Sequence, residues 1–252
     1  MDVLLSLSSG GLVGFVLGLI GGGGSIIATP LLLYAVGLSP HVALGTGALA
    51  VSANAFVNLA GHARTGNVRW SVAAVFSLAG VLGAFGGSTL GKAVDGERLI
   101  LFFAGMMVVI GLAMLRPRPK GGADARAAMS PRMAARTGGI GLCVGLLSGF
   151  FGIGGGFLIV PGLILATGMP MIQAVGTSLF AVGAFGLTTA LNYAASGYVD
   201  WAVAGEFIAG GVLGGWIGMR LALRLAGGRH ALNRIFAGIV FAVAAYIIWR
   251  SA

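Results

Sequence analysis

The sequence contains very little charge. Asp, Glu, Lys and Arg make up 8% of the 252 residues, whereas soluble domains carry about 25%. A chain of this length with so few charges cannot cover itself with a solvated surface, which excludes a soluble globular protein. Hydrophobic residues make up 58% of the chain, and their runs have helix length without the alternation of a membrane barrel strand. The composition therefore predicts an all-α polytopic membrane protein.

Several kinds of functional group are also missing. The one cysteine, Cys143, cannot form an intramolecular disulfide, and we expect it to pack within its apolar run. The sequence has no Walker A motif, no His/Cys/Asp pattern for a metal, no paired carboxylates in an apolar segment and no nucleophile beside a base. We therefore expect neither an enzyme nor a cofactor or metal site.

The chain repeats itself with an offset of 131 residues. "GFVLGLIGGGGSIIATP" from position 14 corresponds to "GLLSGFFGIGGGFLIVP" from position 145. "GTGALAV" from 45 corresponds to "GTSLFAV" from 176, and "GNVRW" from 66 to "GYVDW" from 197. A constant offset indicates an internal repeat. We predict a first membrane repeat at 1–115, a basic cytoplasmic linker at 116–137 and a second membrane repeat at 138–252.

Each repeat contains five apolar segments. The third, fourth and fifth are long enough for a membrane crossing, which needs about 20 residues. The first two are short and are joined by glycines without a charged loop, which predicts a hairpin whose glycine-broken turn lies near the midplane. The predicted segments are 3–20, 25–38, 41–60, 70–91 and 99–115 in the first repeat, and 138–151, 155–167, 171–192, 201–221 and 231–249 in the second.

The basic residues predict the orientation. With a cytoplasmic linker and hairpins that return to their own side, twelve Lys and Arg lie on the cytoplasmic side and three on the other. This distribution satisfies the positive-inside rule. The net charge of +9 therefore reflects the orientation of the chain in the bilayer and does not indicate binding to nucleic acid. Because each repeat has an odd number of segments, the second repeat is predicted to be inverted in the membrane relative to the first. His62 and Arg64 are predicted to lie in a cytoplasmic loop, where they are either solvated or form a gate or attract anions.

The two glycine clusters predict a binding site for a small anionic substrate. A helix that starts inside the membrane presents unpaired N–H groups and the positive end of its dipole, which attract anions. Inverted repeats with broken helices place such a site near the midplane, open to each side in turn. Alternatively, glycine-rich faces serve close helix packing or a homodimer interface. The candidates in the clusters are Gly23, Gly24, Ser25, Gly154, Gly155 and Gly156.

Polar residues on the third segment of each repeat extend this candidate site. Hydroxyls and amides donate to oxyanions, although they also form hydrogen bonds between membrane helices. Glu206 is an acid within an apolar segment, so it is either a proton-coupling residue or a residue at the membrane interface. The further substrate-binding candidates are Thr46, Asn54, Asn58, Thr177, Ser178 and Thr188.

The combination of "GIGGGFLIVP" at 152–161, "GTS" at 176–178 and "GYVDW" at 197–201 resembles the TauE/SafE sulfite exporter family, also called the 4-toluene sulfonate uptake permease family. The resemblance spans nearly the whole chain outside the linker. It implies a multi-pass permease of the bacterial inner membrane for anions such as sulfite or sulfoacetate-like sulfonates. In the first repeat, Arg69 stands where the family usually has Asp, and Ser25 adds a hydroxyl.

The predicted function is therefore a secondary transporter that moves sulfur-containing anions by alternating access. The alternative is an anion channel in which the two glycine hairpins line a continuous pore.

Overall fold

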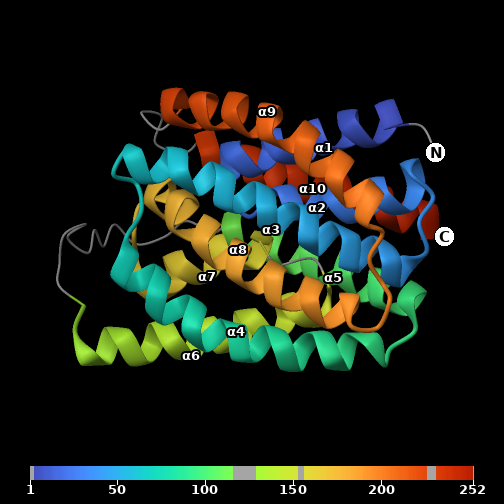
Figure 1. The fold of residues 1–252 in the computed structure, drawn as a ribbon. Coiled ribbons are helices and arrows are strands. Elements are labelled where there is room, and N and C mark those ends of the chain that lie inside the picture. The colour runs from blue at the N-terminus through green and yellow to red at the C-terminus, as the bar shows by residue number, and fades with distance from the viewer. Residues whose placement is uncertain (1–2, 116–128, 153–155, 226–230, 252) are drawn as a thin grey trace.

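A computed structural model gives the architecture of the chain (Figure 1). It describes residues 3–115, 129–152, 156–225 and 231–251, so the candidates Gly154 and Gly155 lie outside the described residues. Within these ranges every element is a helix, as the composition predicts. The elements are α1 (Val3–Ile20), α2 (Gly24–Pro30), the π-helical turn η1 (Leu31–Ala35), α3 (Pro40–Arg64), α4 (Trp70–Lys92), α5 (Gly96–Leu115), α6 (Pro131–Phe150), α7 (Gly156–Thr167), α8 (Met171–Ala194), α9 (Trp201–Leu225) and α10 (Ala231–Ser251).

The helix bounds follow the predicted segments, and α1 has the predicted bounds, but α6 begins at Pro131 rather than at residue 138. Among the described residues, α1, α3, α4, α6, α8 and α9 are long and apolar enough to cross a membrane. The prediction of a short first segment is therefore wrong for α1 and α6, which have 18 and 20 residues. α6 starts inside the predicted linker, because Ser130 Oγ accepts a hydrogen bond from the Met133 amide and Pro131 stands at the first helical position.

Each glycine cluster ends one helix and allows the next to begin. Gly21 follows α1 with a φ of 69°, and Gly152 follows α6 with a φ of 65°. This left-handed conformation is the usual end of a helix and is readily adopted by glycine. The shorter apolar helices 24–35, which is α2 with η1, and Gly156–Thr167 follow these two turns.

Glycine stripes allow two pairs of helices to pack backbone against backbone. α1 lies along α9, where Gly14 contacts Gly211, and α6 lies along α4, where Gly145 contacts Gly80. A Cβ on Gly14 or Gly145 would overlap the facing backbone, whereas a Cβ on Gly211 or Gly80 would first meet the side chain of Asn54 or Phe185. The 131-residue offset converts the first contact into the second. Close packing within the chain is therefore one use of these stripes.

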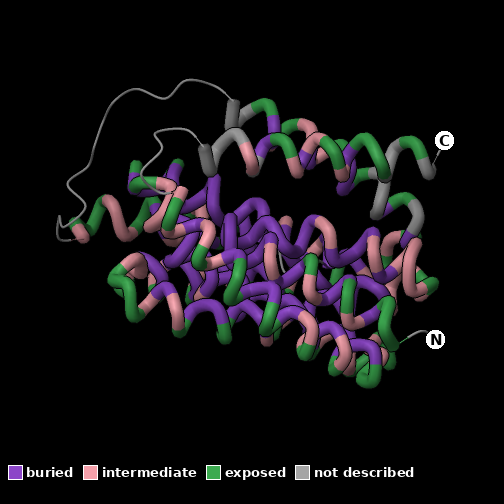
Figure 2. The backbone as a smooth tube through the Cα atoms, turned by 90° about the horizontal axis from the view of Figure 1, so that it is seen from above, coloured by how far each residue is buried: buried purple, intermediate pink, exposed green. Residues whose placement is uncertain are grey.

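The long helices α3 and α8 lie at the centre of the bundle. Figure 2 shows the buried residues gathered in the interior, and α3 packs directly on α8. Ser52 Oγ donates to the Gly183 carbonyl at 2.7 Å, and these residues are 131 positions apart. The same position in the two repeats therefore meets at the centre. α5 and α10 pair with each other along one side of the bundle, where α10 contacts α2 and α5 contacts α7 (Figure 1).

The outer surface of the bundle is apolar. Leu78 and Leu82 on α4 are 74% and 72% exposed, and Leu213 on α9 is 72% exposed. Large exposed apolar surfaces of this kind suit contact with lipid rather than water. Together with the helices long enough to cross a membrane, this surface describes a multi-pass membrane protein.

Two predictions about single residues are wrong. His62 is not in a solvated loop, because α3 continues to Arg64 and His62 is fully buried in its last turn, beside Gly18 of α1. Cys143 does not pack into the interior, because its face of α6 is turned outward and the side chain is exposed.

Candidate functional site

The two glycine breaks meet inside the molecule. Gly22 precedes α2 and lies against Gly156 at the start of α7, and a Cβ on either residue would overlap the backbone of the other. Both residues are buried. We call this contact the glycine crossing. The predicted residues Gly23 and Gly24, which follow Gly22, face α1 rather than α7. Sequence reasoning therefore identified the cluster but missed Gly22 as the residue in contact.

Two serine hydroxyls accompany the glycine crossing. Ser25 is fully buried, and its Oγ donates to the Gly22 carbonyl at 2.8 Å. Ser178 is also fully buried, donates to the Val175 carbonyl at 2.8 Å and lies beside Gly21. Two helical segments, 24–35 and α7, begin at this place. The positive ends of their dipoles and their first N–H groups favour a negatively charged ligand there.

Thr46 and Thr177 connect the two repeats. Thr46 Oγ1 accepts from the Asp200 amide at 2.9 Å, and Thr177 Oγ1 accepts from the Arg69 amide at 3.0 Å. The 131-residue offset converts one bond into the other. Each bond holds the start of α4 or α9 against the third segment of the opposite repeat. Thr188, in contrast, donates to the Ala184 carbonyl within its own helix at 2.8 Å.

The starts of α4 and α9 differ in their capping. Asp200 Oδ1 accepts from the amides of Ala202 and Val203, each at 3.1 Å, which satisfies two N–H groups of the first turn of α9. Arg69 occupies the equivalent position before α4, where its side chain makes no capping hydrogen bond. An arginine has no acceptor, so it cannot replace the aspartate in this role.

Asn54 and Asn58 lie on one face of α3 and belong to a longer column. Asn54 Nδ2 donates to the Phe207 carbonyl at 3.4 Å, and Asn58 Nδ2 donates to the Asn54 carbonyl at 2.8 Å. His62, one turn further along, donates from Nε2 to the Gly18 carbonyl at 3.3 Å. Sequence reasoning assigned His62 to a loop, although its four-residue spacing from Asn58 was the signal that could have identified it.

Glu206 lies away from the glycine crossing. It is on α9, and Gly210, one turn further along, contacts Leu7 near the start of α1. The break at Gly21 is about 20 Å from Leu7 along the axis of α1. The carboxylate oxygen Oε2 is buried and has no hydrogen-bond partner within the described part of the chain.

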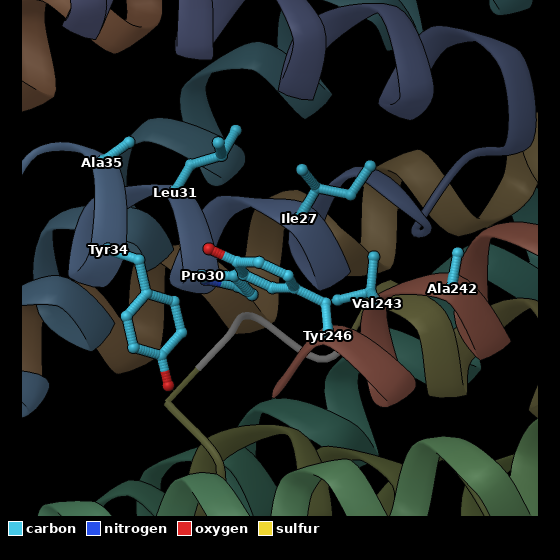
Figure 3. Close-up of a pocket in the computed structure, with 8 residues that line it drawn as sticks. All are labelled: Ile27, Pro30, Leu31, Tyr34, Ala35, Ala242, Val243 and Tyr246. Carbon is cyan, nitrogen blue, oxygen red and sulfur yellow. The ribbon is translucent and has the colours of Figure 1, made fainter. Parts of the chain in front are cut away.

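A cavity of about 260 Å³ lies between α10 and the segment formed by α2 and η1 (Figure 3). Its wall is mostly apolar and includes Pro30, Leu31 and Val243. The rings of Tyr34 and Tyr246 meet edge to face, with centroids 5.7 Å apart. None of the described substrate-binding candidates is among its lining residues. Such a wall does not offer the hydrogen bonds that a desolvated oxyanion needs.

Comparison with known proteins decides the family. The sequence model for "Sulfite exporter TauE/SafE" matches residues 6–247. The chain belongs to the TauE/SafE sulfite exporter family. A relative in Xylella fastidiosa (strain 9a5c), named "Probable membrane transporter protein", is 55% identical over 251 residues, which cover 99% of this chain and 96% of the relative.

More distant relatives occur in other microorganisms. A probable membrane transporter protein of Bacillus subtilis (strain 168) is 26% identical over 218 residues, covering 83% of this chain and 86% of the relative. One from Methanocaldococcus jannaschii is 27% identical over 204 residues, covering 75% of this chain and 73% of the relative. No solved structure matches the chain significantly.

Proposed function

We propose that this TauE/SafE protein is a secondary transporter, and not an enzyme, that moves sulfur-containing anions across the bacterial inner membrane. Sulfite and sulfoacetate-like sulfonates are the substrates that the family description and the glycine breaks together support. The names of the relatives support transport in general. The observation that carries the proposal is the glycine crossing, where Gly22 and Gly156 bring two helix starts together.

An oxyanion suits the groups at the glycine crossing. Its oxygens accept hydrogen bonds, and the first turns of two helices offer N–H donors with a favourable dipole. Ser25 and Ser178 add hydroxyls beside the break that are fully buried. Bonds from hydroxyl and amide groups to an ionised acceptor are stronger than bonds between neutral groups, so such a site can compensate an anion for its lost hydration without a fixed positive charge.

Alternating access is supported by the reciprocal contacts of the two repeats. Thr46 and Thr177 hold equivalent amides of the opposite repeat, and Ser52 contacts its own equivalent position, Gly183. A pair of repeats related by a two-fold axis makes contacts of this kind, and the distribution of Lys and Arg predicts that the pair is inverted across the membrane. Direct backbone contact at the glycine crossing favours a carrier over a channel, because a continuous pore there would separate Gly22 from Gly156.

The test is thermal stabilisation of the purified protein by a panel of anions. Sulfite, thiosulfate, sulfoacetate, taurine, aromatic sulfonates and sulfate are compared with carboxylates of matched size. A ligand at one hundred times its Kd stabilises the folded state by about 2.7 kcal/mol, which raises Tm by about 5–11 °C in a chain of this size. Stabilisation by sulfur oxyanions alone supports the proposal. Stabilisation by carboxylates alone would retain the anion site and reject the sulfur-containing substrate.

Transport and conduction are separated in proteoliposomes. A carrier exchanges labelled external anion for unlabelled internal anion, so counterflow exceeds net uptake and saturates with concentration. A channel gives a conductance that does not require anion on the opposite side. Conductance of single-channel size without counterflow would reject the carrier and support the anion channel.

A further inference from the structure

Three polar side chains form a buried column on one face of α3. Asn54, Asn58 and His62 are 1%, 4% and 0% exposed and follow one another at four-residue intervals. Asn54 lies against Gly211, and Asn58 lies against Gly215 and Gly18. The column therefore occupies the boundary between α3 and the tightly packed pair α1–α9. Eight residues of helix correspond to a length of about 12 Å.

Two acceptor atoms of this column have no hydrogen-bond partner among the described residues. They are Asn54 Oδ1 and His62 Nδ1, and both are buried. Burial of a polar atom without a partner is unfavourable, and an apolar side chain could fill the same place without that loss. Both atoms are acceptors, so a donor completes them, and water that enters along this boundary would supply it.

The second repeat shows that helix packing alone does not require this polarity. The positions equivalent to Asn54, Asn58 and His62 are Phe185, Thr189 and Tyr193 on α8. Phe185 is stacked on Phe76 with ring centroids 6.0 Å apart. Thr189 and Tyr193 also have buried hydroxyls without a partner in the described chain. The Thr189 hydroxyl can rotate toward a carbonyl of its own helix, however, whereas the Asn54 oxygen needs a donor.

The column connects the centre of the bundle with the end of α3. Asn54 is two residues from Ser52, which contacts Gly183 where the repeats meet. His62 is bonded to Gly18, three residues before the break at Gly21. The N–H groups of the column donate here to backbone carbonyls. When the boundary opens they can donate to an oxyanion without a permanent charge, and the two free acceptors then bind the water that hydrates it. Conduction requires binding that is favourable enough for entry and weak enough for release, and neutral donors in series meet this requirement.

We propose that Asn54, Asn58 and His62 line the path by which a hydrated oxyanion moves between the end of α3 and the glycine crossing. The path opens when α3 separates from the pair α1–α9. This inference rests on the proposed transport function and adds His62 to it as a substrate-contacting residue. The proposed path is polar in the first repeat, at Asn54. The equivalent place in the second repeat is filled by the stacked rings of Phe76 and Phe185.

The path is tested by the reactivity of cysteines placed along it. Cys143→Ser removes the one native thiol, which is exposed. Asn58→Cys and His62→Cys are then treated, in membranes, with a sulfonatoethyl thiosulfonate reagent and with its trimethylammonium analogue. Ala55→Cys, at a fully buried site on a neighbouring face of α3, and Thr189→Cys, at the equivalent site on α8, are the matched controls.

We expect both column cysteines to react with the sulfonate reagent at least about tenfold faster than Ala55→Cys, and the sulfonate to be preferred over the ammonium analogue after correction for their reactivity with a free thiol. Reaction rates equal to that of Ala55→Cys would overturn the path, and equal rates with the two reagents would overturn its preference for anions. Each variant is included only if its melting temperature shows that it folds, and two column positions keep the test valid if one fails.

The labelling needs no knowledge of the transported anion, so its outcome is independent of the stabilisation panel. Fast labelling without stabilisation by any anion would support the path but reject the proposed substrate class. Stabilisation by sulfur oxyanions without labelling would leave the proposed function and reject the path.

Discussion

Replacement of Gly22 by alanine should destabilise the protein far more than the same replacement at Gly23. A Cβ on Gly22 overlaps the backbone of Gly156, and neither backbone can move without separating α2 from α7. Overpacking costs about 1–3 kcal/mol, and we expect about 3 kcal/mol because the overlap involves main-chain atoms on both sides. For a chain of this size, each kcal/mol corresponds to about 2–4 °C, so Tm should fall by about 6–12 °C.

Gly23→Ala is the matched control in the same cluster. Its Cβ meets Cδ1 and Cγ1 of Ile20, side-chain atoms that can shift more readily than main-chain atoms, so we expect a smaller loss of about 1 kcal/mol. Thermal unfolding of the purified variants in detergent, followed by tryptophan fluorescence, measures both. If Gly22→Ala melts within about 2 °C of Gly23→Ala, the two breaks are not in tight contact and the anion site built on their contact is refuted.

Three other substitutions test individual hydrogen bonds through the same melting experiment. Arg69→Asp should be about 1 kcal/mol more stable than Arg69→Ala, because it gives α4 the cap that Asp200 gives α9; equal melting temperatures would contradict this. Lys92→Met should lose about 1.5–3 kcal/mol, because the ammonium donates to the Asn192 carbonyl at 3.0 Å and to Asn192 Oδ1 at 2.7 Å. A neutral result would show that solvent replaces these bonds and a third bond, from the ammonium to Ser196 Oγ at 2.9 Å. Ser52→Ala should lose about 1 kcal/mol with its bond between the repeats, and a smaller loss than in Ser8→Ala, an exposed control, would contradict that role.

The apolar runs, and the residues that separate them, predicted most of the fold. The starts of α4 and α9 fall at the predicted tryptophans, and contiguous glycines marked both breaks. The start of α6 could not be predicted from composition, because its first turns are polar and were assigned to the linker. A local cap, Ser130 followed by Pro131, extends the helix there. Such a cap depends on a single side-chain contact rather than on the average polarity of a segment.

The candidate site was less predictable than the fold. Residue type identified Thr46 and Thr177 as polar groups in apolar helices, but their oxygens are bonded to amides of the opposite repeat. Which partner a hydroxyl finds depends on the rotation of its helix and on the neighbour it faces, and one sequence does not specify either. The same reason separates Gly22 from Gly23, since one residue of register decides which glycine meets α7.

The glycine stripes also restrict how the protein can move. Gly14 and Gly211 lock α1 to α9, and Gly145 and Gly80 lock α6 to α4, so each locked pair contains one helix from each repeat. Tightly packed interfaces of this kind resist gradual deformation. In the alternating-access cycle proposed above, we therefore expect that the two repeats are not the moving units, because separating the repeats would break both pairs. A movement that preserves both pairs has to open along their boundaries with α3 and α8, and the boundary with α3 is the one that carries Asn54, Asn58 and His62.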